Sequence, residues 1–188
     1  MFISKSKIQN PKQSLNSKFQ ILNTTHLENF VYLLKELIKI PGDFEINFMS
    51  PHPKDFSDEL IDLIAKEKKI SKEIHLPMQS GDNKILQKMN RGYKADDYLA
   101  LIQKMRRKIK GLLISTDIIV GFPGETEQNF RNTVKLVKLS NISKGYISIY
   151  SPRNGTQAQK KFADSVPQEI KKKRWLILEK MINKKTKR

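Results

Sequence analysis

Four apolar segments constrain this chain more than any other feature, because each runs directly into a loop of prolines, glycines and polar residues. The segments span residues 44–49, 73–76, 112–120 and 145–150. A helical pattern follows each one, and this alternation is typical of βαβ units with a parallel sheet. Such folds carry their chemistry on the loops after the carboxyl ends of the strands. The sequence therefore predicts an α/β fold, part of a barrel whose working face is formed by these loops.

The chain is organised as a polar lead followed by one domain. Residues 1–17 have no sustained apolar period, so we expect them to be disordered. Residues 18–188 are expected to form a partial barrel domain, with a short strand at 18–22. Apolar spacing predicts helices over residues 26–40, 58–69, 81–89, 95–109, 127–140 and 167–182.

The charge of the chain is strongly positive. Thirty-six lysines and arginines against 19 acids give a formal charge of +17, which favours a polyanionic partner such as nucleic acid. A lysine-rich proteome with solvated helix faces is an equally good explanation. The basic residues bunch at 104–110 and 171–188, and a solvated face would account for either bunch.

Two absences narrow the possibilities. No run of about 18 apolar residues is present and the first residues lack the apolar centre of a signal peptide, so we expect a cytoplasmic location. The sequence has no cysteine, which excludes disulfides, thiolate catalysis and cysteine-ligated clusters within this chain. The three histidines, His26, His52 and His75, fall on separate predicted elements, so no metal site is expected.

The loop residues supply the candidate site. Gln79 and Ser80 offer an amide and a hydroxyl beside a helix start, which suits a carboxylate or phosphate, although a capped turn explains them almost as well. Asp117 lies in a buried strand, where a carboxylate is costly unless it has a partner or faces a polar cavity, so it is the best single candidate, with a buried structural hydrogen bond as the alternative. Arg153, two residues before Gly155, is a plausible anion clamp, with a surface salt bridge as the alternative.

Two further loops are less specific. In the segment 121–126, two glycines and Glu125 suit either close approach to a ligand or a well-formed turn before a helix. His52 stands between two prolines in a stiff loop. For His75, a hydrogen-bonded structural role is favoured over a ligand role.

Together the loops resemble the radical S-adenosylmethionine methylthiotransferases. The matching motifs are SPHPKDF at 50–56, HLPMQSG at 75–81, MNRGY at 89–93, TDIIVGFPGET at 116–126 and YSPRNGT at 150–156. The likeness runs from about residue 27 to residue 183. Within the family, the first two motifs look most like the MiaB-type enzymes, which convert N6-dimethylallyladenosine beside the tRNA anticodon to its 2-methylthio form.

The resemblance implies the C-terminal part of a (β/α)6-type partial barrel with outer helices, which binds S-adenosylmethionine against a 4Fe-4S cluster. In the family, a 5′-deoxyadenosyl radical abstracts hydrogen from C2 of adenine in the tRNA anticodon stem-loop, and a second cluster is associated with sulfur donation. The residues that this resemblance makes candidates for the cofactor are Gln79, Ser80, Asp117 and Arg153. Those that it places on the active face are His52, Arg91 and Glu125.

The chain departs from the family in its missing cysteines. Family members ligate the radical cluster through Cys-x-x-x-Cys-x-x-Cys and the second cluster through further cysteines, none of which occurs here. We therefore expect the product of a truncated, split or frameshifted gene, or of an incomplete gene model, that requires a cysteine-bearing portion for activity. Smaller departures are Asp82 in place of serine and Asn154 in place of proline.

Two other functions compete with this one. The chain is alternatively a cluster-free, basic RNA-binding remnant of such an enzyme. A Schiff-base aldolase ranks last, since it needs a desolvated lysine at a strand end and no predicted strand has a lysine in its interior.

Overall fold

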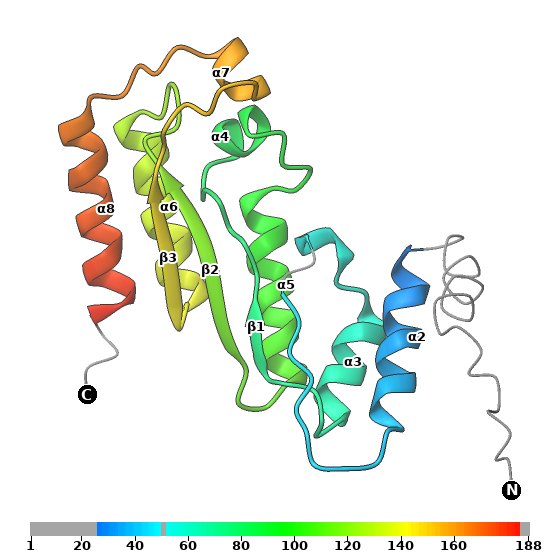
Figure 1. Ribbon diagram of the computed structural model, residues 1–188. Helices are drawn as coiled ribbons and strands as arrows, with labels where there is room; N and C mark the ends of the chain where they lie inside the picture. The colour runs from blue at the N-terminus through cyan, green and yellow to red at the C-terminus, as the bar shows by residue number, and fades with distance from the viewer. Residues whose placement is uncertain (1–25, 50–51, 185–188) are drawn as a thin grey trace, which may run out of the picture. The chain divides into compact units, whose positions relative to one another are not determined.

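The computed structural model of this chain describes residues 26–49 and 52–184 (Figure 1). The chain divides into two compact units, Met1–Gly42 and Asp43–Arg188. The predicted disordered lead and the predicted strand at 18–22 lie outside the described residues. In the first unit, helix α2 (His26–Ile38) confirms the helix predicted there. Among the described helices, none is both long and apolar enough to cross a bilayer.

The second unit is built on a three-stranded parallel sheet. Strands β1 (Glu73–His75), β2 (Leu113–Val120) and β3 (Lys144–Ile149) lie in the order β1-β2-β3. These confirm three of the four predicted strands and the α/β class.

The strand predicted at 44–49 is wrong. Only Ile46 pairs there, in an isolated parallel bridge with Ile70. Ile46 N–H donates to the Lys69 carbonyl at 2.7 Å, and the Ile46 carbonyl accepts from Ser71 N–H at 3.0 Å. The partner segment around Ile70 turns before β1 begins, so pairing cannot extend beyond this one residue.

Helices follow each strand, as the apolar periods predicted. They are α3 (Asp58–Lys66), α4 (Asn83–Lys88), α5 (Ala95–Lys108), α6 (Glu127–Ser140) and α8 (Gln168–Ile182). Ser57 is the N-cap of α3, and its hydroxyl accepts from Leu60 N–H at 3.1 Å. Two short helices were not predicted, the 3-10 helix η2 (Pro53–Asp55) and α7 (Gln157–Lys161).

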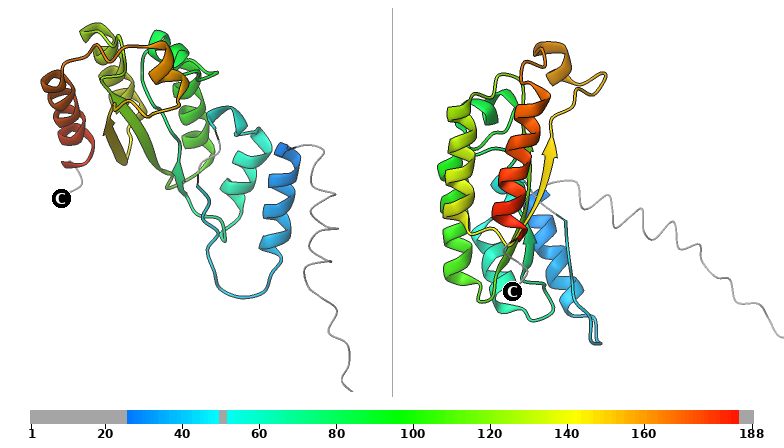
Figure 2. Two further views of the ribbon diagram at one scale, coloured as in Figure 1. Left: turned by 45° about the horizontal axis from the view of Figure 1, so that its top comes forward. Right: turned by 90° about the vertical axis from the view of Figure 1, so that its left-hand side faces the viewer.

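The helices α5, α6 and α8 cover one face of the sheet (Figures 1 and 2). Alternate residues of β2 point toward them, and Ile114, Ile118 and Val120 are completely buried. Burial of each such side chain stabilises the fold by roughly 1.5–3 kcal/mol. The other face carries more polar and more exposed residues, such as Asp117 and Tyr146.

Side chains of α8 cover the outer edge of β3. Trp175 Nε1 donates to the Ile147 carbonyl at 2.9 Å. The Asn183 amide bonds both backbone groups of Gly145, accepting from N–H at 3.0 Å and donating to the carbonyl at 2.8 Å. These bonds occupy backbone groups that an exposed edge strand would leave free to pair with another chain.

Candidate functional site

A cavity of about 650 Å³ lies at the carboxyl ends of the three strands. All three post-strand loops contribute to it, together with α4 and α7. Its lining includes Gln79, Lys88, Arg91, Asp117, Ile119, Phe122, Ser148, Tyr150, Arg153 and Ala158. The structure thus brings together four of the predicted site residues, Gln79, Arg91, Asp117 and Arg153, as the parallel topology led us to expect.

Gln79 holds an unusual backbone conformation at this site. Its φ is 62°, in the left-handed region that residues other than glycine seldom adopt. Backbone bonds on both sides fix it, since its N–H donates to the Asp117 carbonyl at 2.8 Å and its carbonyl accepts from Ile119 N–H at 2.9 Å. Such locally strained residues cluster at functional sites.

Three buried hydroxyls anchor the loop after β1. Thr116 Oγ1 and the Tyr98 hydroxyl both donate to the Leu76 carbonyl, at 2.7 and 2.8 Å. The Tyr93 hydroxyl donates to the Pro77 carbonyl at 3.0 Å. Burial raises the pKa of Tyr93 to about 12. These three hydroxyls therefore fix the backbone of the loop that carries Gln79.

Asp117 is held by a polar chain that crosses from β2 to β1. His75 Nε2 lies 3.1 Å from Asp117 Oδ2, and His75 Nδ1 lies 3.0 Å from the Ser115 hydroxyl. His75 is buried, which confirms its hydrogen-bonded role, whereas the Asp117 side chain is 43% exposed. The histidine thus orients a carboxylate that remains accessible from the cavity.

The cavity lining carries more positive than negative charge. Lys88, Arg91 and Arg153 are its cations, and Asp117 is its carboxylate. Within residues 26–49 and 52–184, no carboxylate forms an ion pair with any of these three cations. The lining therefore suits a ligand with an anionic group and a hydrogen-bonding group.

Ser80 lies away from the cavity. Its hydroxyl is 3.4 Å from Thr133 Oγ1 of α6 and accepts from Asp82 N–H at 3.2 Å. The adjacent Gly81 approaches α6 so closely that a methyl group there would collide with the Thr133 backbone. In this conformation the Ser80 hydroxyl joins the loop to α6.

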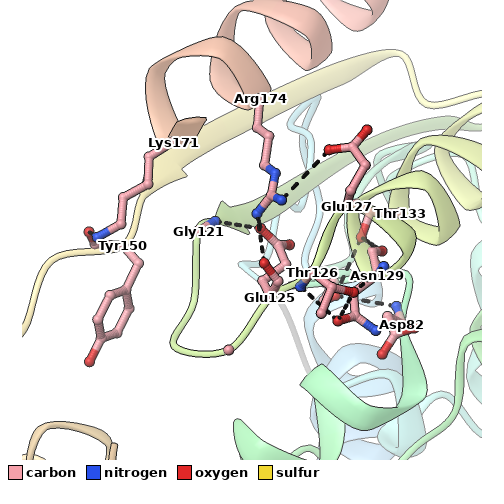
Figure 3. Close-up of polar contacts among 12 residues, drawn as sticks. Asp82, Gly121, Glu125, Thr126, Glu127, Asn129, Thr133, Tyr150, Lys171 and Arg174 are labelled. Carbon is pink, nitrogen blue, oxygen red and sulfur yellow. Dashed lines mark hydrogen bonds and ion pairs between the residues drawn. The ribbon is translucent and has the colours of Figure 1, made fainter. Parts of the chain in front are cut away.

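Glu125 of the loop 121–126 also lies outside the cavity lining, and its side chain turns back toward Gly121 (Figure 3). Its Oε2 accepts from Gly121 N–H and from Arg174 Nη1, each at 2.7 Å. Burial raises the pKa of Glu125, and the two donors oppose that rise. The carboxylate shapes the loop, and the loop in turn places Phe122 in the cavity wall.

His52 lies at the start of the short helix η2. It is the N-cap of η2, where Nδ1 accepts from Lys54 N–H at 3.4 Å. Its ring packs edge-on against Tyr93 with centroids 5.1 Å apart. Burial, together with the nearby charge of Arg91, lowers the pKa of His52. His52 is outside the cavity lining.

The sequence analysis missed Lys171 and Arg174. The C-terminal basic bunch was interpreted as a solvated or nucleic-acid-binding surface, yet these two side chains are only 1% and 5% exposed. Both bond to groups at the carboxyl ends of β2 and β3. Their spacing from Leu178 and Ile182 was the available signal, because the four positions form one buried stripe of α8.

The residues present do not fit an iron-sulfur cluster. The sequence contains no cysteine, and no group of three or more His, Asp or Glu in the described part of the chain could hold a metal ion. A 4Fe-4S cluster is held by thiolates. The donor set for such a cluster is therefore absent from this chain.

Comparison with known proteins identifies the fold and the family. Residues 19–137 match the model of the Radical SAM superfamily. The tRNA-2-methylthio-N(6)-dimethylallyladenosine synthase of Fusobacterium nucleatum is 46% identical over 157 residues, covering 84% of this chain and 36% of that protein. The enzyme of the same name from Thermotoga petrophila is 48% identical over 156 residues, covering 81% of this chain and 35% of that protein.

Among solved structures, the chain resembles coproporphyrinogen III oxidase (HemN) from Escherichia coli, a radical SAM enzyme. The TM-score is 0.63 at 21% identity, covering 82% of this chain and 35% of that one. This likeness confirms the predicted fold, part of a radical SAM barrel with parallel strands and outer helices. The chain spans about a third of the length of the curated relatives it matches.

Proposed function

This chain belongs to the Radical SAM superfamily, and from that membership we propose that it is part of the catalytic barrel of a tRNA methylthiotransferase. Its cavity is proposed to hold the adenosyl and methionyl groups of S-adenosylmethionine. One observation carries this proposal: the cavity lies at the carboxyl ends of the strands and is lined by residues of the motif loops. That is the expected place for a ligand in a parallel α/β fold.

The lining has the chemistry that this ligand needs. A volume of about 650 Å³ is suitable for a small molecule. Ile119 and Phe122 offer apolar contact to adenine, and Asp117 can accept hydrogen bonds from ribose hydroxyls. Arg91 and Arg153 suit the methionyl carboxylate. The radical chemistry of the family would also need a 4Fe-4S cluster, for which this chain has no thiolate ligand.

The chain alone is proposed to be incompetent for that chemistry, because it lacks thiolates for the cluster. Anaerobic reconstitution with iron and sulfide should therefore leave it without stoichiometric iron. A brown protein with cluster absorbance would contradict this expectation. We assign to these residues only the binding and orientation of the cofactor, and to cysteines outside this sequence the ligation of iron.

The proposed substrate is N6-dimethylallyladenosine next to the anticodon of tRNA, methylthiolated at C2. This proposal rests on the names of the relatives, which are 46% and 48% identical to this chain. The charge of +17 agrees with an RNA substrate. A tRNA substrate also favours a cytoplasmic location.

Cofactor binding can be tested with S-adenosylhomocysteine, which needs no iron to be a probe. We expect backbone amide resonances of Gln79, Ile119 and Phe122 to shift on titration, with millimolar affinity. Asp117→Asn should weaken binding, whereas Asp96→Asn, a matched change on the exposed start of α5, should not. Absence of any shift at these amides at saturating probe would reject the proposed function.

A second candidate, a cluster-free RNA-binding module, is favoured by the exposed lysines of α8. Lys172, Lys173 and Lys180 face solvent. If the chain binds a tRNA anticodon stem-loop, log K should fall linearly with log salt, with a slope of about −0.7 to −0.9 per phosphate contact. Fluorescence anisotropy at several salt concentrations measures this slope. RNA binding without adenosyl binding would favour this candidate over the first.

A further inference from the structure

We propose that Lys171 and Arg174 of α8 are positioning residues, which hold the cavity walls in their ligand-binding shape. Neither side chain lines the cavity. They act through the loop 121–126 and through the end of β3. The inference rests on the proposed function, because the ligand whose binding they support is the adenosyl cofactor.

Arg174 holds the loop after β2 through the Glu125 carboxylate, which also accepts a hydrogen bond from Gly121 (Figure 3). Its Nη1 donates to Glu125 Oε2 at 2.7 Å and to the Glu125 carbonyl at 3.0 Å. The same Oε2 accepts from Gly121 N–H, so one guanidinium fixes both ends of the turn. Arg174 also lies near Glu127, with Nη2 and Oε2 3.7 Å apart.

Lys171 holds the end of β3. Its Nζ donates to the Tyr150 carbonyl at 3.2 Å and to both oxygens of Asp164, at 2.6 and 2.7 Å. Its aliphatic stem packs so tightly against Gly121 that a methyl group on that residue would collide with it. One side chain thus contacts both cavity walls.

The two walls meet inside the cavity. Phe122 follows Gly121, and its ring packs edge-on against the Tyr150 ring with centroids 5.1 Å apart. Both rings line the cavity and belong to one buried cluster with Ile85. Any shift of the loop or of the strand end therefore moves an aromatic side chain that faces the ligand.

Buried charges are an expensive way to hold a loop, since each must be desolvated. If both members of an ion pair, such as Arg174 and Glu125, were replaced by apolar residues of similar size, α8 would pack as stably or better. Lys171 and Arg174 instead make the contacts directional, because a guanidinium and an ammonium form hydrogen bonds only where acceptors are placed. This favours a role in geometry over a role in stability alone.

The test compares Lys171→Met with Lys173→Met, an exposed neighbour that loses the same charge. In Lys171→Met the stem still fills the space beside Gly121, and Asp164, which is 31% exposed, can be solvated. We expect Lys171→Met to lower affinity for S-adenosylhomocysteine about tenfold, as for one lost charge-assisted hydrogen bond, and Lys173→Met to match the parent chain. Equal affinity in both variants would overturn the proposal, even if the melting temperature of Lys171→Met fell.

A ligand-independent measurement separates this inference from the proposed function. Hydrogen exchange of the Gly121 amide should accelerate on the order of tenfold or more in Arg174→Met. The double variant Arg174→Met/Glu125→Gln, which retains an acceptor for Gly121 N–H, should restore slow exchange. If the parent chain bound no adenosyl probe, the proposed function would fail. Unchanged Gly121 exchange in Arg174→Met would separately show that Arg174 does not hold the loop 121–126.

Discussion

The loops after β2 and β3 form two walls of the same cavity and are built in opposite ways. In the loop 121–126, Gly121, Phe122 and Glu125 are buried, and its carboxylate is neutralised by a buried guanidinium. In the loop 151–156 every residue is exposed. Both have six residues with glycine, proline, threonine and one charge. Composition therefore does not reveal which loop is fixed.

The two loops differ because Arg174 of α8 bonds to Glu125 in the first loop, whereas the second loop is exposed to solvent. The buried carboxylate of Glu125 in the first loop has no solvent to replace a lost partner, so it holds a single geometry. Arg153 in the second loop is solvated, and its side chain can move toward an anion at little cost. One wall thus shapes the cavity and the other supplies an adjustable charge.

The largest expected effect on stability comes from removing the ion pair between Arg174 and Glu125. Arg174→Met leaves the Glu125 carboxylate buried without its charged partner, so we expect a loss of about 3–5 kcal/mol in the free energy of unfolding. Urea denaturation measures it. Arg153→Met, the same change in the exposed loop, should stay within about 0.5 kcal/mol. Equal effects would contradict the comparison.

A glycine pair sharpens the comparison with a smaller change. Gly121 and Gly155 both have positive φ, 72° and 84°, so alanine at either position costs about 1–2 kcal/mol of left-handed strain. Only at Gly121 does the added methyl group collide with a buried side chain, Lys171. We expect Gly121→Ala to be the more destabilising by at least about 1 kcal/mol, from overpacking.

Thermal unfolding of the two alanine variants provides this measurement. The steric part is isolated because the backbone strain is common to both. If Gly155→Ala proved as destabilising as Gly121→Ala, the loop after β3 would be more constrained than its exposure indicates.

The sequence predicted β2 well because its apolar run is long. The run 112–120 could only be a buried strand, and β2 occupies most of it. The run 44–49 was as apolar, but its pairing depended on a distant segment that turns at Ile70. Pairing partners of this kind are not encoded in local periodicity.

The site was predictable in part for the same reason. Parallel topology alone brings Gln79, Asp117 and Arg153 to one edge. The direction of a side chain within its loop is a tertiary property, and this is why Ser80 and Glu125 lie away from the cavity. The burial of Lys171 depended on Asp164, which is seven residues away and has no helical relation to it.

A third prediction concerns Asp82, a buried residue that joins α4 to α6. Its Oδ1 caps α4 by accepting from Lys84 N–H at 2.9 Å, and its Oδ2 accepts from Asn132 of α6 at 2.7 Å. Burial acts to raise the pKa of Asp82, but these hydrogen bonds together lower it. Asp82→Ala should cost about 1–2 kcal/mol as a lost N-cap.

The sign of the pH effect follows from the lowered pKa of Asp82. Stability from this group is present above its unfolded pKa near 3.8 and is lost as pH falls through the lower folded value. Asp82→Asn keeps a good cap but has no charge to titrate, so its stability should fall less steeply at acid pH. A parallel decline in both proteins, measured by urea unfolding between pH 5 and pH 2, would rule out this contribution.

The smallest expected effect is a gain, and it belongs to the exposed wall. Thr156 N–H donates to the Arg153 carbonyl at 3.2 Å, and Gly155 has a φ of 84°, as in a type II turn with Asn154 at its second position. Proline is favoured at that position because its ring fixes φ near the value required. Asn154→Pro should therefore stabilise the chain by about 0.4–1 kcal/mol, chiefly by restricting the unfolded state. Asn154→Ala, which lacks the ring, should give no such gain in urea unfolding. If Asn154→Pro destabilised the chain, the loop 151–156 would be constrained by more than its turn, despite its exposure.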